Sequence, residues 1–160
     1  MRLELGRRTD YAIRATVDLA HHHGDGRRKG RAIADAMAIP TSYVPQILAE
    51  LVRAQLVRSV AGREGGYELA RPPSEISLFD VVHAAEGDVV STECILRGGP
   101  CSSEDACAAH APWSQAQHAL LDSLAATSLA DLLGIDKDVA AGGYANPSEL
   151  RWRTTLGAEE

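Results

Sequence analysis

Apolar residues recur at helical spacing in several stretches of the chain, and glycine and proline separate these stretches. Residues 9–23 predict a first helix that ends at Gly24-Asp25-Gly26. Residues 32–37 predict a short second helix that ends at Ile39-Pro40. A third helix should begin at once, capped by Thr41 or Ser42, because one face then collects Val44, Ile47, Leu48, Leu51 and Val52.

Two short helices joined by a tight turn have the layout of a helix-turn-helix. In that motif the side chains near the start of the second helix face the edges of DNA bases. We therefore expect the DNA-contacting residues to include Thr41, Ser42, Tyr43 and Gln46.

A β-hairpin is predicted directly behind this helix pair, with strands at residues 56–60 and 67–70. The turn between them, Gly62-Arg63-Glu64-Gly65-Gly66, is rich in glycine. Gly65 and Gly66 would let the backbone approach a phosphate or the minor groove, and Arg63 would supply positive charge at the tip. A hairpin in this position is typical of the wing of a winged helix.

The second half of the chain is predicted to be helical around a polar loop. Ser77 should cap a helix that Gly87 closes, a longer helix should run from Pro112 to about Ala126, and residues 128–133 should form a last short turn. The expected fold is mainly α with a small β wing. We divide the chain into residues 1–73, residues 74–134 and a weakly ordered tail, residues 135–160.

Charge differs sharply between the two halves of the chain. Residues 1–73 contain 12 Lys and Arg against 8 Asp and Glu, net +4, whereas residues 74–160 contain 4 against 14, net −10. A basic first half favours phosphate contacts, and an acidic second half is free for dimerisation or sensing.

Other function classes are disfavoured by what the sequence lacks. No apolar run approaches the roughly 18 residues of a membrane helix and no signal peptide is evident, so a cytoplasmic protein without membrane contact is expected. No phosphate-binding glycine loop or nucleophile elbow is present, so an enzyme is not expected.

The cysteines lie close together in the polar loop, as Cys94-x6-Cys101-x5-Cys107, with His110 just beyond. An odd number of cysteines in a cytosolic chain disfavours a disulfide framework, and a polar loop offers little to bury them. These spacings differ from the CxxC pairs typical of structural zinc. The residues alone favour an iron-sulfur cluster, with zinc and free redox thiols as the alternatives.

Several motifs together resemble the winged-helix regulators that include the iron-sulfur cluster regulator IscR and the nitric-oxide sensor NsrR. The motifs that carry this resemblance are Met1-Arg2-Leu3, residues 9–15 (TDYAIRA), Ser42-Tyr43 with Gln46, Gly65-Gly66-Tyr67, residues 76–82 (ISLFDVV) and the cysteine triplet. The resemblance implies a homodimer in which the long helix after the cysteines crosses its twin. Residues 74–134 would then hold the cluster-binding loop and the dimerisation helix.

The resemblance implies two candidates for a fourth cluster ligand. His110, three residues after Cys107, matches the IscR type, in which three cysteines and a histidine hold a 2Fe-2S cluster. Asp10 matches the NsrR type, in which an aspartate of the other subunit completes a 4Fe-4S cluster. We favour His110 and the 2Fe-2S cluster.

The predicted function is a homodimeric regulator that binds an operator in double-stranded DNA and senses redox state, nitric oxide or iron-sulfur status through its cluster. The alternative is a zinc-stapled or apo winged-helix regulator that responds to a small metabolite or a partner protein.

Overall fold

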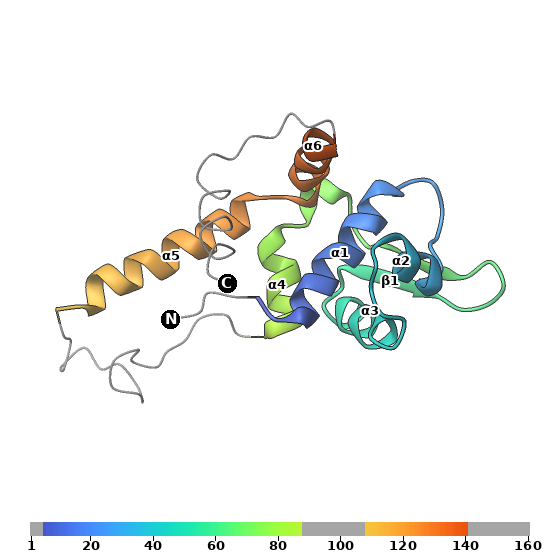
Figure 1. The fold of residues 1–160 in the computed structure, drawn as a ribbon, viewed down its shortest axis with the longest axis horizontal. Coiled ribbons are helices and arrows are strands. Elements are labelled where there is room, and N and C mark those ends of the chain that lie inside the picture. Colours follow the sequence, from blue (N-terminus) through green and yellow to red (C-terminus); the bar gives the residue numbers. More distant parts are fainter. Residues whose placement is uncertain (1–4, 88–107, 141–160) are drawn as a thin grey trace, which may run out of the picture.

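The structure, a computed structural model, describes residues 5–87 and 108–140. The elements in chain order are α1 (Arg7–His21), α2 (Gly30–Ala36), α3 (Val44–Arg53), β1 (Val57–Val60), β2 (Gly66–Leu69), the 3-10 turn η1 (Pro73–Glu75), α4 (Leu78–Glu86), α5 (His110–Ala126) and α6 (Leu129–Ala140). The expected fold class, mainly helical with a small hairpin, is confirmed (Figure 1).

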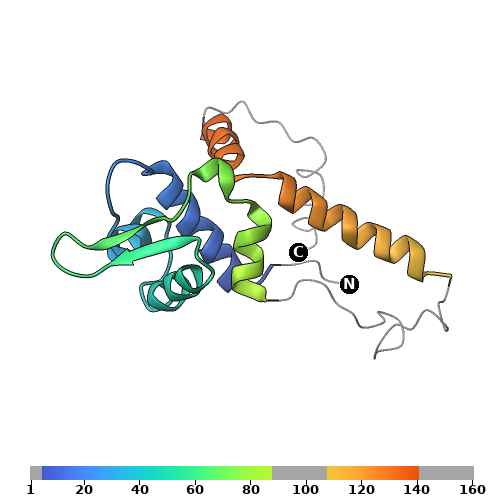
Figure 2. The ribbon, with the colours of Figure 1, turned by 180° about the vertical axis from the view of Figure 1, so that it is seen from behind.

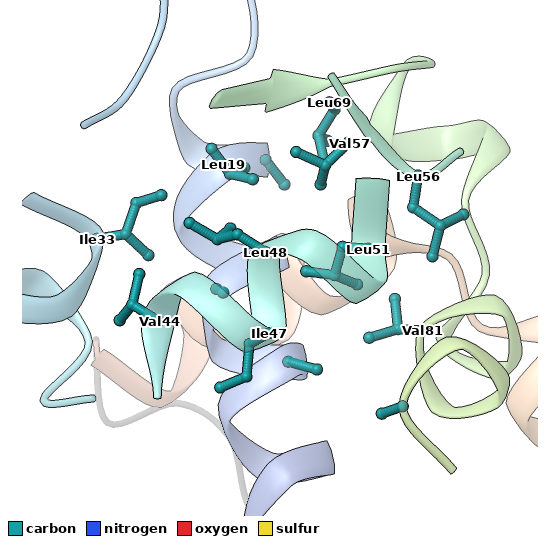
Figure 3. Close-up of a cluster of buried hydrophobic side chains, with 14 of the residues drawn as sticks. Leu19, Ile33, Val44, Ile47, Leu48, Leu51, Leu56, Val57, Leu69 and Val81 are labelled. Carbon is teal, nitrogen blue, oxygen red and sulfur yellow. The ribbon is translucent and has the colours of Figure 1, made fainter. Parts of the chain in front are cut away.

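The hydrophobic core lies around α1, which packs against α2, α3, α4 and α6. Ile47, Leu48 and Leu51 of α3 turn into this core, and each is at most 2% exposed (Figure 3). Val81 of α4 and Leu129 of α6 are fully buried in the same cluster. Burial of one such aliphatic side chain contributes about 1.5–3 kcal/mol, so these contacts hold the helices that carry the polar surface described below.

The hairpin is antiparallel, with Val57 opposite Leu69 and Val60 opposite Gly66. Val57 and Leu69 point into the core, whereas Val60 is 41% exposed near the tip. The paired strands project from the body beside α2 (Figure 1). The predicted wing is therefore present.

Helix α4 begins and ends as its sequence predicts. Ser77 accepts a hydrogen bond from the Asp80 N–H (3.1 Å), and the Asp80 carboxylate accepts one from the Ser77 N–H (2.9 Å), which is a capping box. Gly87 follows the helix with φ +81°, a conformation that glycine adopts without steric strain.

Helix α5 extends away from the winged helix, as both views show (Figures 1 and 2). None of its residues is buried in the single chain, and Leu120 is 48% exposed. It begins at His110, slightly before the predicted Pro112, and ends at Ala126 as expected.

Two predictions about helix ends are wrong. The N-cap of α3 is Tyr43, not Thr41 or Ser42, and no side chain bonds there, because the Tyr43 N–H donates to the Pro40 carbonyl (2.9 Å) in the preceding turn. The last turn, expected at residues 128–133, is the longer helix α6, because Gly134 continues the helix instead of ending it. The rest of the predicted tail, residues 141–160, lies outside the described residues.

Candidate nucleic-acid interface

The residues predicted to contact DNA lie at the N-terminal end of α3, where the chain leaves the turn after α2. Thr41, Ser42, Tyr43 and Gln46 are all exposed there. Val44, Ile47 and Leu48 on the opposite side of the helix are buried. The amphipathic pattern therefore presents a polar edge to solvent, as a recognition helix requires.

Tyr43 is supported from behind by Tyr11 of α1. The two rings meet edge to face, with centroids 5.4 Å apart and planes at 61°. Such a pair restrains both rings and contributes about 0.5–1.5 kcal/mol beyond area burial. Tyr11 was not predicted to belong to the site, because a helical apolar position carries no sign of a partner 32 positions away.

Gln46 is oriented by a buried carboxylate. Its side-chain amide nitrogen donates to Glu50 (3.2 Å), whose other oxygen accepts a hydrogen bond from Arg8 Nε (2.8 Å). Glu50 is only 7% exposed, so its charge depends on these partners. One amide hydrogen and the amide oxygen of Gln46 remain for a ligand, and this is the pair that recognises the N6 and N7 edge of adenine.

The wing tip is a tight turn in which the Gly65 N–H donates to the Gly62 carbonyl (3.0 Å). A Cβ at Gly65 would lie 2.1 Å from the Val60 carbonyl oxygen, so this position accepts only glycine. Gly66, at φ +152°, would place a Cβ 2.6 Å from the Arg28 carbonyl oxygen. Arg63 is exposed in the turn between Gly62 and Gly65, where a phosphate or the minor groove could reach it.

His110, a candidate metal ligand within the described residues, lies away from the DNA-contacting surface, at the start of α5. Cys94, Cys101 and Cys107 lie outside the described residues. His110 is exposed at the start of α5, the end that points away from the winged helix (Figure 2). In residues 5–87 and 108–140 no three His, Cys, Asp or Glu side chains form a metal-binding group.

Asp10, the alternative ligand, lies in the first turn of α1 and forms an ion pair with Arg14 (2.9 Å). Its side chain is 44% exposed. In both ribbon views the start of α1 is well separated from the start of α5, so one chain does not bring Asp10 and His110 together.

Comparison with known proteins identifies the family. Residues 5–134 match the Rrf2 family, which is described as an iron-dependent transcriptional regulator. The chain belongs to the Rrf2 family. It is similar to the HTH-type transcriptional regulator IscR of Photorhabdus laumondii, with 33% identity over 141 residues, 88% of this chain and 85% of that protein.

Solved structures agree with this assignment. IscR of T. potens matches with a TM-score of 0.69 and 29% identity, over 91% of this chain and 95% of that one. CymR, the global cysteine regulator of B. subtilis, matches with a TM-score of 0.72 and 27% identity, over 84% of this chain and 98% of that one. This Rrf2 protein is a DNA-binding transcriptional regulator with a winged helix, and not an enzyme. Among its described helices, none is both long and apolar enough to cross a membrane.

Proposed function

We propose that this Rrf2 regulator acts as a homodimer that binds operator DNA through α3 and the wing and senses its signal through an iron-sulfur cluster. Base edges would be read by Thr41, Ser42, Tyr43 and Gln46, while Arg63, Gly65 and Gly66 would contact the DNA backbone or minor groove. The observation that carries the DNA surface is the exposed polar end of α3, braced by Tyr11 and Glu50.

The cluster would be held by Cys94, Cys101, Cys107 and His110. Thiolates and a neutral imidazole are suitable ligands for iron, and His110 is an accessible side chain three positions after the last cysteine. Asp10 of a second subunit is the alternative fourth ligand and would go with a 4Fe-4S cluster in place of 2Fe-2S. When bound, such a cluster supplies a centre that responds to electrons, oxygen or nitric oxide.

A homodimer is supported by the surface of α5. This helix is 17 residues long, and its large apolar side chains are not buried in the single chain. Leu120 is exposed, and the others are half-buried: Trp113, Leu121 and Leu124. An isolated helix of this length is marginal in water, and packing against a second copy would cover these apolar residues.

The cluster is tested by purifying the full chain without oxygen. We expect a coloured protein with visible absorbance, and iron and sulfide close to two of each per subunit for 2Fe-2S. Replacement of any one of Cys94, Cys101 or Cys107 by Ala should abolish the colour and leave the circular dichroism of the fold unchanged. Full cluster content in two of these three variants would overturn the proposal.

The DNA surface is tested by two substitutions with different expected signatures. Gln46→Ala should change preference at one base pair by about 1–3 kcal/mol, because a side-chain amide reads one base. Arg63→Ala should weaken binding to all sequences and flatten its salt dependence, because a phosphate or groove contact carries little sequence information. Unchanged binding in both variants would place the DNA surface elsewhere.

A second candidate function is favoured by the match to CymR, the cysteine regulator. In that case the chain would be a zinc-bound or metal-free regulator that responds to a small metabolite or a partner protein. The same anaerobic preparation separates the two candidates. A colourless protein with zinc, or without metal, would support the second one.

A further inference from the structure

The segment between α1 and α2 pairs with the outer edge of the wing. The Arg28 N–H donates to the Tyr67 carbonyl (2.9 Å), and the Tyr67 N–H donates to the Arg28 carbonyl (2.8 Å), as an antiparallel bridge. A two-stranded hairpin is marginally stable by itself. Arg28 therefore gives β2 a second neighbour at the point where the wing leaves the body.

The side chain of Arg28 fixes this bridge to α1. Its Nε and Nη2 donate to the two carboxylate oxygens of Asp18, both at 2.9 Å. Asp18 is only 2% exposed, so its charge must be paired, and this hydrogen bond raises the pKa of the Arg28 guanidinium above its ordinary value. The backbone of residue 28 is thereby held between α1 and β2.

Lys29 extends from this anchor to the tip of the wing. Its ammonium donates to the Arg63 carbonyl (2.7 Å) and lies 3.4 Å from the Gly62 carbonyl oxygen. Both carbonyls belong to the turn that displays the Arg63 side chain. Two of the three ammonium hydrogens are thus directed at the wing itself.

We propose that Lys29 is a positioning residue for DNA binding, which holds the wing tip so that Arg63 reaches the DNA. Lys29 lies in the basic run Arg27-Arg28-Lys29, where a direct phosphate contact would be the simpler assumption. Its hydrogen bonds, and the engagement of Arg28 with Asp18, assign this part of the run to supporting the wing. The inference rests on the proposed contact between Arg63 and DNA.

A double-mutant cycle with Lys29→Met and Arg63→Ala tests this role on the full chain. We expect Lys29→Met to weaken operator binding by about threefold to tenfold, which corresponds to the net contribution of one ordinary hydrogen bond. In the Arg63→Ala background it should cause no further loss, and the salt dependence should stay that of Arg63→Ala. Lys29→Arg should retain affinity, because a guanidinium can donate to the same two carbonyls.

Hydrogen exchange at the wing provides a readout that does not depend on DNA. Lys29→Met should speed exchange of the Gly65 amide, whereas Arg63→Ala should not, and the thermal midpoint should be the same in both. Lys137→Met, which removes a positive charge from α6, is the matched control and should leave wing exchange and the cycle unchanged.

The outcomes distinguish failure of the positioning role of Lys29 from failure of the proposed contact between Arg63 and DNA. If Lys29 binds a phosphate directly, the losses multiply and the salt slope falls by about 0.9 beyond that of Arg63→Ala, which would overturn the positioning role while the wing contact stands. Unchanged wing exchange in Lys29→Met would also overturn it. If Arg63→Ala leaves affinity unchanged, the proposed wing contact itself fails.

Discussion

Ser77 and Ser128 form an antiparallel bridge, and each of them also starts a helix. Beside them the Leu78 N–H donates to the Thr127 carbonyl (2.7 Å), and the Leu129 N–H donates to the Ile76 carbonyl (2.8 Å). Ile76 and Leu129 are both fully buried. The end of α5 is therefore fixed to the start of α4, and a displacement of α5 would be passed to α4 and to α1, against which α4 packs.

Ser77→Ala should lower the free energy of unfolding by about 1 kcal/mol, because it removes the side chain that caps α4. Urea denaturation followed by circular dichroism measures this loss. Ser123→Ala is the matched control, because Ser123 is exposed within α5 and only its backbone carbonyl accepts the Thr127 hydroxyl. The control should be neutral or slightly stabilising, since alanine favours helix. An equal loss in both variants would contradict the role of the cap.

Asp131 should make the stability of α6 depend on pH. The Ser128 hydroxyl and the Ser128 N–H both donate to its carboxylate, at 2.6 and 2.8 Å, and these bonds lower the pKa of Asp131. A lowered pKa stabilises the fold above the ordinary Asp range, and the effect is lost as pH falls through the folded-state pKa. The difference in urea midpoint between the native chain and Asp131→Ala should therefore be full at neutral pH and shrink below about pH 4. If the difference in urea midpoint stayed constant below about pH 4, the hydrogen bonds from Ser128 to the Asp131 carboxylate would not contribute to stability.

Local patterns predicted the elements well where caps and periodicity agree. Ser77 and Gly87 mark both ends of α4, and the apolar positions Ile47, Leu48 and Leu51 give the buried side of α3. Thr41 and Ser42 misled the prediction of the α3 cap, because the turn after Pro40 carries the chain one residue further.

Contacts between distant segments could not be predicted from such patterns. Arg28 and Lys29 are only a basic run in the sequence, and their partners Asp18, Tyr67 and Arg63 lie on other elements. The burial of Asp18 was no easier to predict, because adjacent residues of a helix point in different directions and apolar Leu19 and Ala20 therefore say little about the side chain before them. Identifying the partner of Asp18 required the fold.

Arg28→Ala should destabilise the protein strongly, by about 3 kcal/mol, because it leaves the carboxylate of Asp18 buried without its partner. Arg31→Ala is the control, since the Arg31–Asp35 pair is 3.9 Å apart and its side chains are 89% and 69% exposed. That change should stay within about 0.5 kcal/mol. A comparable loss of stability in both variants would contradict the role of the ion pair between Arg28 and Asp18.

Two glycines with open surroundings should respond to alanine in opposite directions. A Cβ at Gly134 or at Gly24 would meet nothing within 4 Å, but Gly24 has φ +93° whereas Gly134 lies within α6. Gly134→Ala should stabilise the chain by up to about 1 kcal/mol through helix propensity. Gly24→Ala should destabilise it by about 1–2 kcal/mol, because an L side chain is strained in that conformation. Thermal midpoints of the two variants give the answer, and a shift in the same direction for both would contradict it.

The fourth cluster ligand can be assigned by three substitutions, because Asp10 has a second role that must be separated from ligation. Asp10→Ala removes a candidate ligand, but it also removes the ion pair with Arg14, which donates to the Met37 carbonyl (3.5 Å) between α2 and α3. Arg14→Ala breaks the same ion pair and leaves the Asp10 carboxylate in place. Any effect of Asp10→Ala that arises from packing of α1 should therefore be reproduced by Arg14→Ala.

We expect His110→Ala to change the absorbance spectrum or the stability of the cluster, with Asp10→Ala and Arg14→Ala giving smaller effects that resemble each other. Anaerobic absorbance, together with iron and sulfide content, measures all three. The opposite pattern would be decisive, because only a lost ligand explains a cluster that disappears in Asp10→Ala and persists in both Arg14→Ala and His110→Ala. The 2Fe-2S assignment would then fail, a 4Fe-4S cluster completed by Asp10 of a second subunit would replace it, and nitric oxide would become the favoured signal.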